Sequence, residues 1–100
     1  MERDHLFAEG DIVYTIGTNG QYILSKILKI EKWEEGEVWH ELIYSPVNTL
    51  PRISEVKDLV VSIYHVPRAR PEELPTYLGN LSLTEDDMEG YNEYLKQIQS

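Results

Sequence analysis

Two histidines are the residues of this chain best placed for acid–base or metal chemistry. His40 lies within an expected strand over 38–44, and His65 lies within another over 59–66. Successive side chains of a strand point to opposite faces, so each imidazole shares a face with apolar residues of its own strand. If the two faces converge, the imidazoles meet and form a site that can bind a metal or exchange protons. The expected face partners are Val38, Leu42 and Tyr44 for His40, and Leu59, Val61 and Ile63 for His65.

The role of this pair stays open at the level of sequence. A metal site needs three or four ligands, and a carboxylate could come from Glu41 or Asp58, but Glu41 points to the face opposite His40. The alternative is that each histidine marks a strand end and hydrogen-bonds a neighbouring backbone carbonyl. We therefore expect no metal and no cofactor. A small metal-dependent or hydrolytic enzyme that uses His40 and His65 is the alternative.

Other catalytic classes lack their motifs. The chain has no cysteine, which excludes disulfides, thiolate nucleophiles and cysteine-ligated zinc. It also has no Gly-x-Ser-x-Gly elbow and no phosphate-binding glycine pattern. The sequence therefore favours a non-enzymatic interaction module.

The charge of the chain indicates what such a module would bind. Its 18 acidic and 9 basic residues give a formal net charge of −9. An acidic surface repels nucleic-acid phosphates and anionic lipids, so neither is an expected partner. Electrostatic steering favours a basic protein partner, although acidity can also serve solubility alone.

The basic residues gather in one part of the sequence. Arg52, Arg68 and Arg70 lie around the proline-containing segments. Guanidinium groups bind carboxylates and other anions, so Arg68 and Arg70 are candidate binding residues. The alternative is that they form ion pairs with glutamates nearby in the sequence, namely Glu55, Glu72 and Glu73.

The strongest local signal for secondary structure is the pair Asn19-Gly20. It separates two runs of strand-like composition, expected over 11–17 and 21–33. Asn-Gly is a strong hairpin signal because both residues accept the positive φ of a type I′ turn. The sequence therefore predicts an antiparallel sheet that opens with this hairpin.

Further strands follow along the chain. A turn around Gly36 precedes the strand expected over 38–44. Residues 53–58 fit either a short strand or a helical turn, and the strand expected over 59–66 is stopped by Pro67.

The last element is a helix expected over 85–99. Thr84 is a suitable N-cap, and acidic residues occupy the first turn, where the helix dipole favours negative charge. Gly90 inside the helix costs about 1 kcal/mol relative to alanine, so packing on the sheet must stabilise it. Its expected apolar stripe consists of Met88, Tyr91, Leu95 and Ile98.

These elements predict one mainly β domain of the α+β class. It is a small, bent antiparallel barrel of about five strands with a C-terminal helix packed on it. No apolar run approaches the roughly 18–20 residues that span a bilayer, and the charged N-terminus lacks a signal-peptide stretch, so we expect a cytoplasmic protein. The expected segments are a polar lead-in (1–9), the barrel (10–66), a proline-rich connection (67–83) and the helix (84–100).

The first half of the chain resembles the opening of Tudor-like small barrels. The resemblance covers residues 10–31 and the segment Val56-Lys57-Asp58-Leu59, which is similar to the short strand before that family's final turn. It implies a reader of methylated lysine or arginine, bound in an aromatic cage by cation–π attraction. Tyr14 would be one cage position. The other aromatic candidates are Tyr22, Trp39 and Tyr44.

The second half resembles small bacterial proteins of immunity type or of uncharacterised function. The residues that carry this resemblance are His65-Val66-Pro67, Leu83 to Asp87, Gly90-Tyr91 and Tyr94-Leu95. It implies an acidic inhibitor that covers a basic toxin, and the net charge of −9 is compatible with electrostatic steering onto such a partner.

Overall fold

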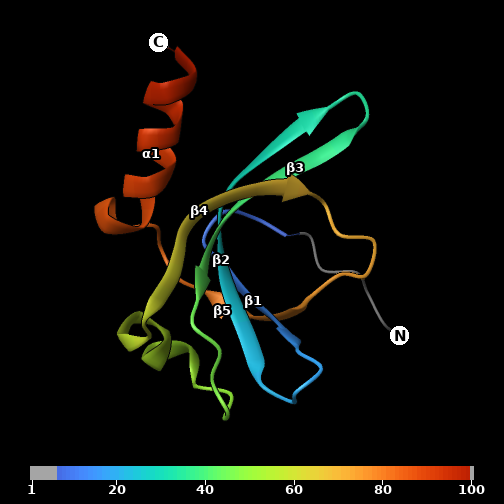
Figure 1. Cartoon of the computed structure of the whole chain (residues 1–100), viewed down its shortest axis with the longest axis vertical. Coiled ribbons are helices and arrows are strands. Elements are labelled where there is room, and N and C mark those ends of the chain that lie inside the picture. Colours follow the sequence, from blue (N-terminus) through green and yellow to red (C-terminus); the bar gives the residue numbers. More distant parts are fainter. Residues whose placement is uncertain (1–6, 100) are drawn as a thin grey trace.

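The computed structural model describes residues 7–99 and shows five antiparallel strands in a single sheet with a C-terminal helix (Figure 1). The strand order is β4-β3-β2-β1-β5, and within the described residues no pairing joins the two edge strands. The predicted fold class is thus confirmed, as a bent sheet that does not close. The elements are β1 (Asp11–Ile16), β2 (Tyr22–Trp33), β3 (Gly36–Tyr44), the 3₁₀ helix η1 (Ile53–Asp58), β4 (Val61–Ala69), β5 (Thr76–Asn80) and α1 (Glu85–Gln99).

The predicted hairpin joins β1 to β2, but its turn is not of type I′. The N–H of Gly17 donates to the carbonyl of Gln21 (2.8 Å), and the N–H of Gly20 donates to the carbonyl of Gly17 (2.9 Å). Among residues 7–99 only glycines have a positive φ, and in this loop that residue is Gly20 (φ +84°). Asn19 therefore does not adopt the conformation that a type I′ turn requires. The loop follows the three-residue pattern, in which a turn precedes a glycine bulge.

The bend of the sheet allows both faces to bury apolar side chains. On β3, Leu42 and Tyr44 belong to one cluster and Trp39 to the other, as the alternation of the strand predicts. The main core, on the face covered by α1 and η1, contains Ile12, Leu24, Leu28, Leu42, Tyr44, Val56 and Tyr91. The second cluster contains Val13, Ile27 and Trp39, with Phe7 and Ile30 packed against it. Of the expected lead-in over 1–9, residues 1–6 lie outside the described part.

Two predictions about the proline-containing region are wrong. Pro67 does not end its strand, because β4 continues to Ala69 with Pro67 opposite His40. β4 is an edge strand, where a missing N–H is tolerated. The expected connection over 67–83 also contains β5, which pairs with β1 and forms the other edge of the sheet.

Residues 53–58 form a 3₁₀ helix, which decides between the two structures expected there. The carboxylate of Glu55 accepts the N–H of Arg52 (2.9 Å), and Val56 is fully buried in the main core. The short strand over 56–59 that the Tudor resemblance implied is therefore absent from the structure.

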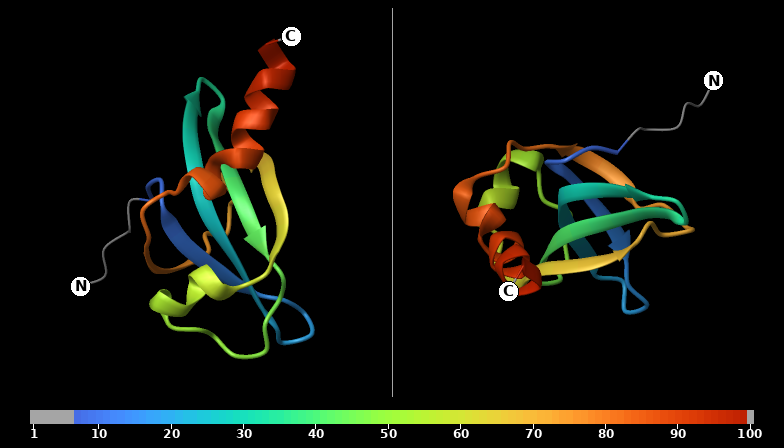
Figure 2. Two further views of the ribbon diagram at one scale, coloured as in Figure 1. Left: turned by 90° about the vertical axis from the view of Figure 1, so that its left-hand side faces the viewer. Right: turned by 90° about the horizontal axis from the view of Figure 1, so that it is seen from above.

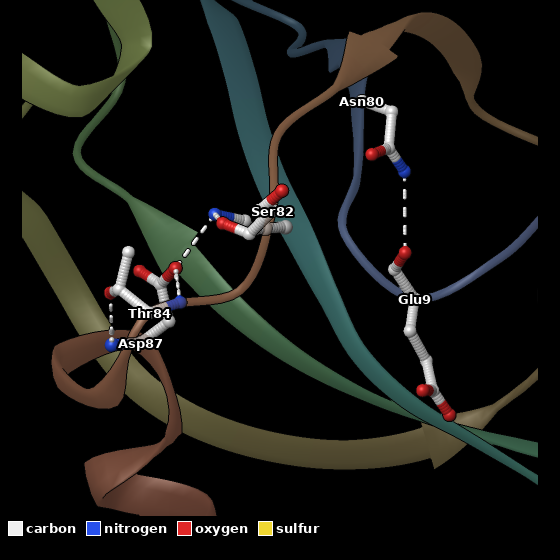
Figure 3. A network of polar contacts seen from close by, with 6 residues as sticks. Glu9, Asn80, Ser82, Thr84 and Asp87 are labelled. Carbon is white, nitrogen blue, oxygen red and sulfur yellow. Dashed lines mark hydrogen bonds and ion pairs between the residues drawn. The ribbon is translucent and has the colours of Figure 1, made fainter.

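The helix α1 has the predicted bounds and the predicted cap. The N–H of Asp87 donates to the hydroxyl of Thr84 (3.1 Å), and the N–H of Thr84 donates to the carboxylate of Asp87 (2.9 Å; Figure 3). α1 and η1 lie on the same side of the sheet (Figure 2). Met88, Tyr91 and Leu95 pack into the core, but Ile98 is 60% exposed and the predicted stripe ends before it. Within the described residues, no helix is long and apolar enough to cross a membrane.

Gly90 is the point at which α1 crosses β4. A Cβ built on Gly90 would lie 2.9 Å from the carbonyl oxygen of Tyr64 and 3.0 Å from its carbonyl carbon. Both neighbours are backbone atoms, so the helix would have to shift to make room. The glycine that weakens the isolated helix is therefore what allows the helix to reach the sheet.

We expect Gly90→Ala to destabilise the protein by about 1–3 kcal/mol, since overpacking outweighs the gain in helix propensity. Urea unfolding followed by circular dichroism measures the change. Asn92→Ala, at an exposed position of the same helix, is the control and should be neutral or slightly stabilising. A Gly90→Ala protein as stable as the wild type would contradict this packing.

Candidate functional site

The structure brings the two histidines together. His40 Nδ1 and His65 Nε2 lie 2.8 Å apart, and the rings are nearly parallel, with centroids 5.0 Å apart and an interplanar angle of 10°. The prediction that His65 shares one strand face with Leu59, Val61 and Ile63 is only partly confirmed. Register shifts between β3 and β4, on either side of Ile43, break the alternation of β4, and Ile63 is 45% exposed. The bulges keep His65 beside His40 without placing Ile63 in the core.

The carboxylate that completes the pair is Glu31, and not Glu41 or Asp58. Glu31 Oε1 lies 2.6 Å from His40 Nε2. The register of the β2–β3 hairpin explains this contact, because Glu31 pairs with Val38 and so lies diagonally across from His40 on the same face. The sequence signal for this contact was the turn before Gly36, because the turn of a hairpin fixes which residues of its two strands pair.

The three side chains form a hydrogen-bonded chain with defined proton positions when both imidazoles are neutral. The N–H at His40 Nε2 donates to the Glu31 carboxylate, so His40 Nδ1 must accept from the N–H at His65 Nε2. The remaining lone pair is then at His65 Nδ1. The arrangement can therefore take up a proton at His65, the outer end of the chain.

Two tyrosines of α1 cover His40 and His65, which together with Glu31 we call the histidine cluster. The ring of Tyr91 lies 5.0 Å from His40 and 5.5 Å from His65, and the ring of Tyr94 lies 4.6 Å from His65, centroid to centroid. His40 is only 1% exposed. Burial raises the pKa of Tyr91, and the neighbouring Glu31, Tyr94 and Glu9 raise it further. The cluster is thus part of the surface on which the helix docks.

Burial lowers the pKa of His65 below its ordinary 6.5, and the adjacent His40 lowers it further. The unfolded chain therefore binds more protons than the folded one in the window just below pH 6.5. We expect stability to be full above this window and to fall as the pH drops through it. His65→Asn should flatten this part of the profile, which urea unfolding at a series of pH values measures. An unchanged slope in the variant would show that His65 is not its origin.

A second polar centre lies under the start of α1. The Lys26 side chain is only 4% exposed, and its Nζ donates to Asp87 Oδ2 (2.7 Å) and to the carbonyl of Ser82 (3.0 Å). Burial alone would raise the pKa of Asp87, but hydrogen bonds from Lys26 and Thr84 outweigh it and lower that pKa. Burial, with Asp87 nearby, raises the pKa of Tyr44 to about 12. The ion pair between Lys26 and Asp87 joins β2 to α1.

A cavity of about 890 Å³ lies beside this ion pair, between η1, β3, β4 and the first turns of α1. We call it the η1–α1 groove. Its apolar lining is buried or partly buried, and its exposed rim is polar. The apolar lining consists of Leu42, Tyr44, Leu59, Val61 and Leu81. The rim includes Ser54, Lys57, Tyr64, Thr84, Asp86 and Glu89.

Of the four aromatic residues expected in a cage, Tyr14, Tyr22 and Tyr44 belong to the main core or pack against it, and Trp39 lies in the second cluster. Tyr14 and Tyr22 form an edge-to-face pair with centroids 5.7 Å apart, and Tyr44 is buried in the main core. Trp39 is fully buried in the second cluster, where its Nε1 donates to Glu37 (3.0 Å). The geometry therefore does not provide the cage that the Tudor resemblance implied from these four residues.

The candidate arginines bind carboxylates of their own chain. Arg68 donates from Nε and Nη2 to the two oxygens of Glu41 (2.7 and 3.0 Å), and Glu41 is completely buried. Arg70 Nε lies 3.4 Å from Glu37 Oε1. The alternative of ion pairing is thus the one observed, although the partners are glutamates of β3. These ion pairs join β4 and the residue that follows it to β3.

Within residues 7–99, no group of three or more histidine, cysteine, aspartate or glutamate side chains is arranged to hold a metal ion. Comparisons with known proteins do not supply a function either. No protein-family model matches the chain, and neither the curated proteins nor the solved structures contain a significant match. The function must therefore be inferred from the geometry and charge of these side chains.

Proposed function

We propose that the protein is a non-enzymatic interaction module that binds a basic protein partner. The observation that carries this proposal is the uneven pairing of its charges. Six basic side chains already form ion pairs within the chain. In contrast, the exposed carboxylates without an ion pair among the described residues are Glu34, Glu35, Glu55, Glu72, Glu73, Glu85, Asp86 and Glu89.

Such an excess acts on a partner in two ways. The summed field accelerates encounter with a positively charged surface, and unpaired carboxylates can form charge-assisted hydrogen bonds with its lysine and arginine side chains. An acidic inhibitor of a basic protein is one form that this function can take. The cytoplasmic location expected from the sequence stays a prediction.

Selection from a random peptide library on the immobilised protein tests this function. We expect the bound sequences to be enriched in lysine and arginine relative to the starting library. A parallel selection at about 1 M salt, where the Debye length falls to about 3 Å, should lose most of this enrichment. Bound sequences without a basic bias, or binding that is indifferent to salt, would contradict the proposal.

A second candidate function is acid–base chemistry at the histidine cluster, favoured by the hydrogen-bonded chain from Glu31 through His40 to His65. In this role His65 would accept a proton, since its lowered pKa keeps it neutral near pH 7. A screen of hydrolase substrates with the wild type and with His65→Gln tests it. Turnover that disappears in the variant would favour this function over the first, and equal activity of both proteins would exclude it.

A further inference from the structure

The η1–α1 groove has an apolar interior and two acidic side chains, Asp86 and Glu89, at its rim. Its interior is apolar, and at about 890 Å³ it is within the range of pockets that take a ligand or a few side chains. Tyr64, at its rim, is 58% exposed. An apolar partner side chain that enters the groove would remove this surface from water.

The charge at the rim of the groove indicates which kind of side chain would lie next to the apolar side chain of the partner. Lys26 is neutralised by Asp87, and Lys57 pairs with Asp58 (3.4 Å). Asp86 and Glu89 form no ion pair among the described residues. These two side chains are three positions apart on α1, so they are neighbours on one helix face.

We infer that the η1–α1 groove binds a segment of a protein partner that carries arginine or lysine next to a large apolar residue. The apolar side chain lies over Leu59 and Val61, and the cation lies between the carboxylates of Asp86 and Glu89. This inference rests on the proposed function, because it names the place at which the basic partner is held. It requires that the partner binds in the groove, whereas the proposed function requires only that the partner binds to the acidic surface.

Three fluorescent peptides serve as probes. The first alternates leucine and arginine, the second has serine in place of every leucine, and the third has glutamate in place of every arginine. We expect the leucine–arginine peptide to bind, the serine–arginine peptide to bind about tenfold more weakly, and the leucine–glutamate peptide not to bind. Equal affinity for the two arginine peptides, or binding of the glutamate peptide, would overturn the inference.

Two charge-reversal variants locate the binding. D86K/E89K changes the rim of the groove, and E34K/E35K makes the same change in net charge at the exposed tip of the β2–β3 hairpin. We expect D86K/E89K to weaken the binding of the leucine–arginine peptide about tenfold, and E34K/E35K to weaken it less than about twofold. D86N/E89Q, compared with E34Q/E35Q, repeats the test without adding lysines to the first turns of α1.

The outcomes separate the two proposals. If both variants weaken the peptide equally, the field of the whole chain attracts it, so the groove is wrong and the proposed function stands. If the leucine–arginine peptide does not bind the wild type, both are wrong. A loss of affinity that is confined to the variants of Asp86 and Glu89 supports both the proposed function and the groove.

Discussion

Replacing Asp87 with alanine is expected to reduce the free energy of unfolding by about 3–5 kcal/mol. The substitution leaves the ammonium of Lys26 buried without its carboxylate, because that side chain is only 4% exposed. It also removes the acceptor for the N–H of Thr84 at the start of α1. Breaking one side of a buried ion pair costs far more than losing an exposed pair, since the remaining charge cannot return to water.

The neighbouring residue provides the control for this prediction. Asp86→Ala changes an exposed carboxylate in the same turn and should alter stability by less than about 0.5 kcal/mol. Lys26→Met should cost less than Asp87→Ala, because Asp87 is 17% exposed and keeps its bonds with Thr84. Urea unfolding gives all three values. Equal losses from Asp87→Ala and Asp86→Ala would contradict the account of the buried pair.

The same pair adds a pH dependence in acid. Because the folded state lowers the pKa of Asp87 from its ordinary 3.8, the stabilisation is fully present above pH 3.8 and is lost as the pH falls from there through the lowered pKa. This window lies below that of His65, so the two effects can be separated in one series of unfolding curves.

Replacing Arg68 with methionine is the second change with a large expected effect, about 3 kcal/mol of lost stability. Glu41 is completely buried, and both of its oxygens are bound by the Arg68 guanidinium. The substitution leaves that carboxylate without a partner between β3 and β4. The cost is at the lower end of the range for buried pairs because the Arg68 side chain is itself 47% exposed.

Arg70 is a matched control for Arg68. It has similar exposure, 46%, but its partner Glu37 is 30% exposed and lies 3.4 Å away. Arg70→Met should therefore cost less than about 1 kcal/mol. Adding Glu41→Gln to Arg68→Met should recover part of the loss by removing the buried charge. Equal costs for the two arginine variants, or no recovery with Glu41→Gln, would contradict this explanation.

Local signals predicted the parts of the fold that local interactions decide. Thr84 and the apolar spacing after it located α1, because capping and amphipathicity act within a few turns. The pair Asn19-Gly20 located the first hairpin for the same reason. β5 was missed because its strand character depends on pairing with β1, which lies more than sixty residues earlier in the chain. Gly90 was interpreted as a cost because its benefit arises only from contact with β4.

The histidine cluster was predictable only in part. Strand alternation placed His40 on the core face, but the bulges that keep His65 beside it have no evident sequence signature. Glu31 becomes a neighbour of His40 only through the register of the β2–β3 hairpin. Lys26, in a strand of apolar residues, gave no sign of its partner Asp87, which comes from the distant helix. The Tudor and immunity-type resemblances remain predictions.

The position of a bound basic segment tests the central claim most directly. Isotope-labelled protein titrated with the leucine–arginine peptide reports that position through the shifts of its backbone amide signals. We predict that the largest shifts occur around the η1–α1 groove, at Ser54, Tyr64, Asp86 and Glu89. Largest shifts at Glu34 and Glu35, on the tip of the β2–β3 hairpin, would contradict it.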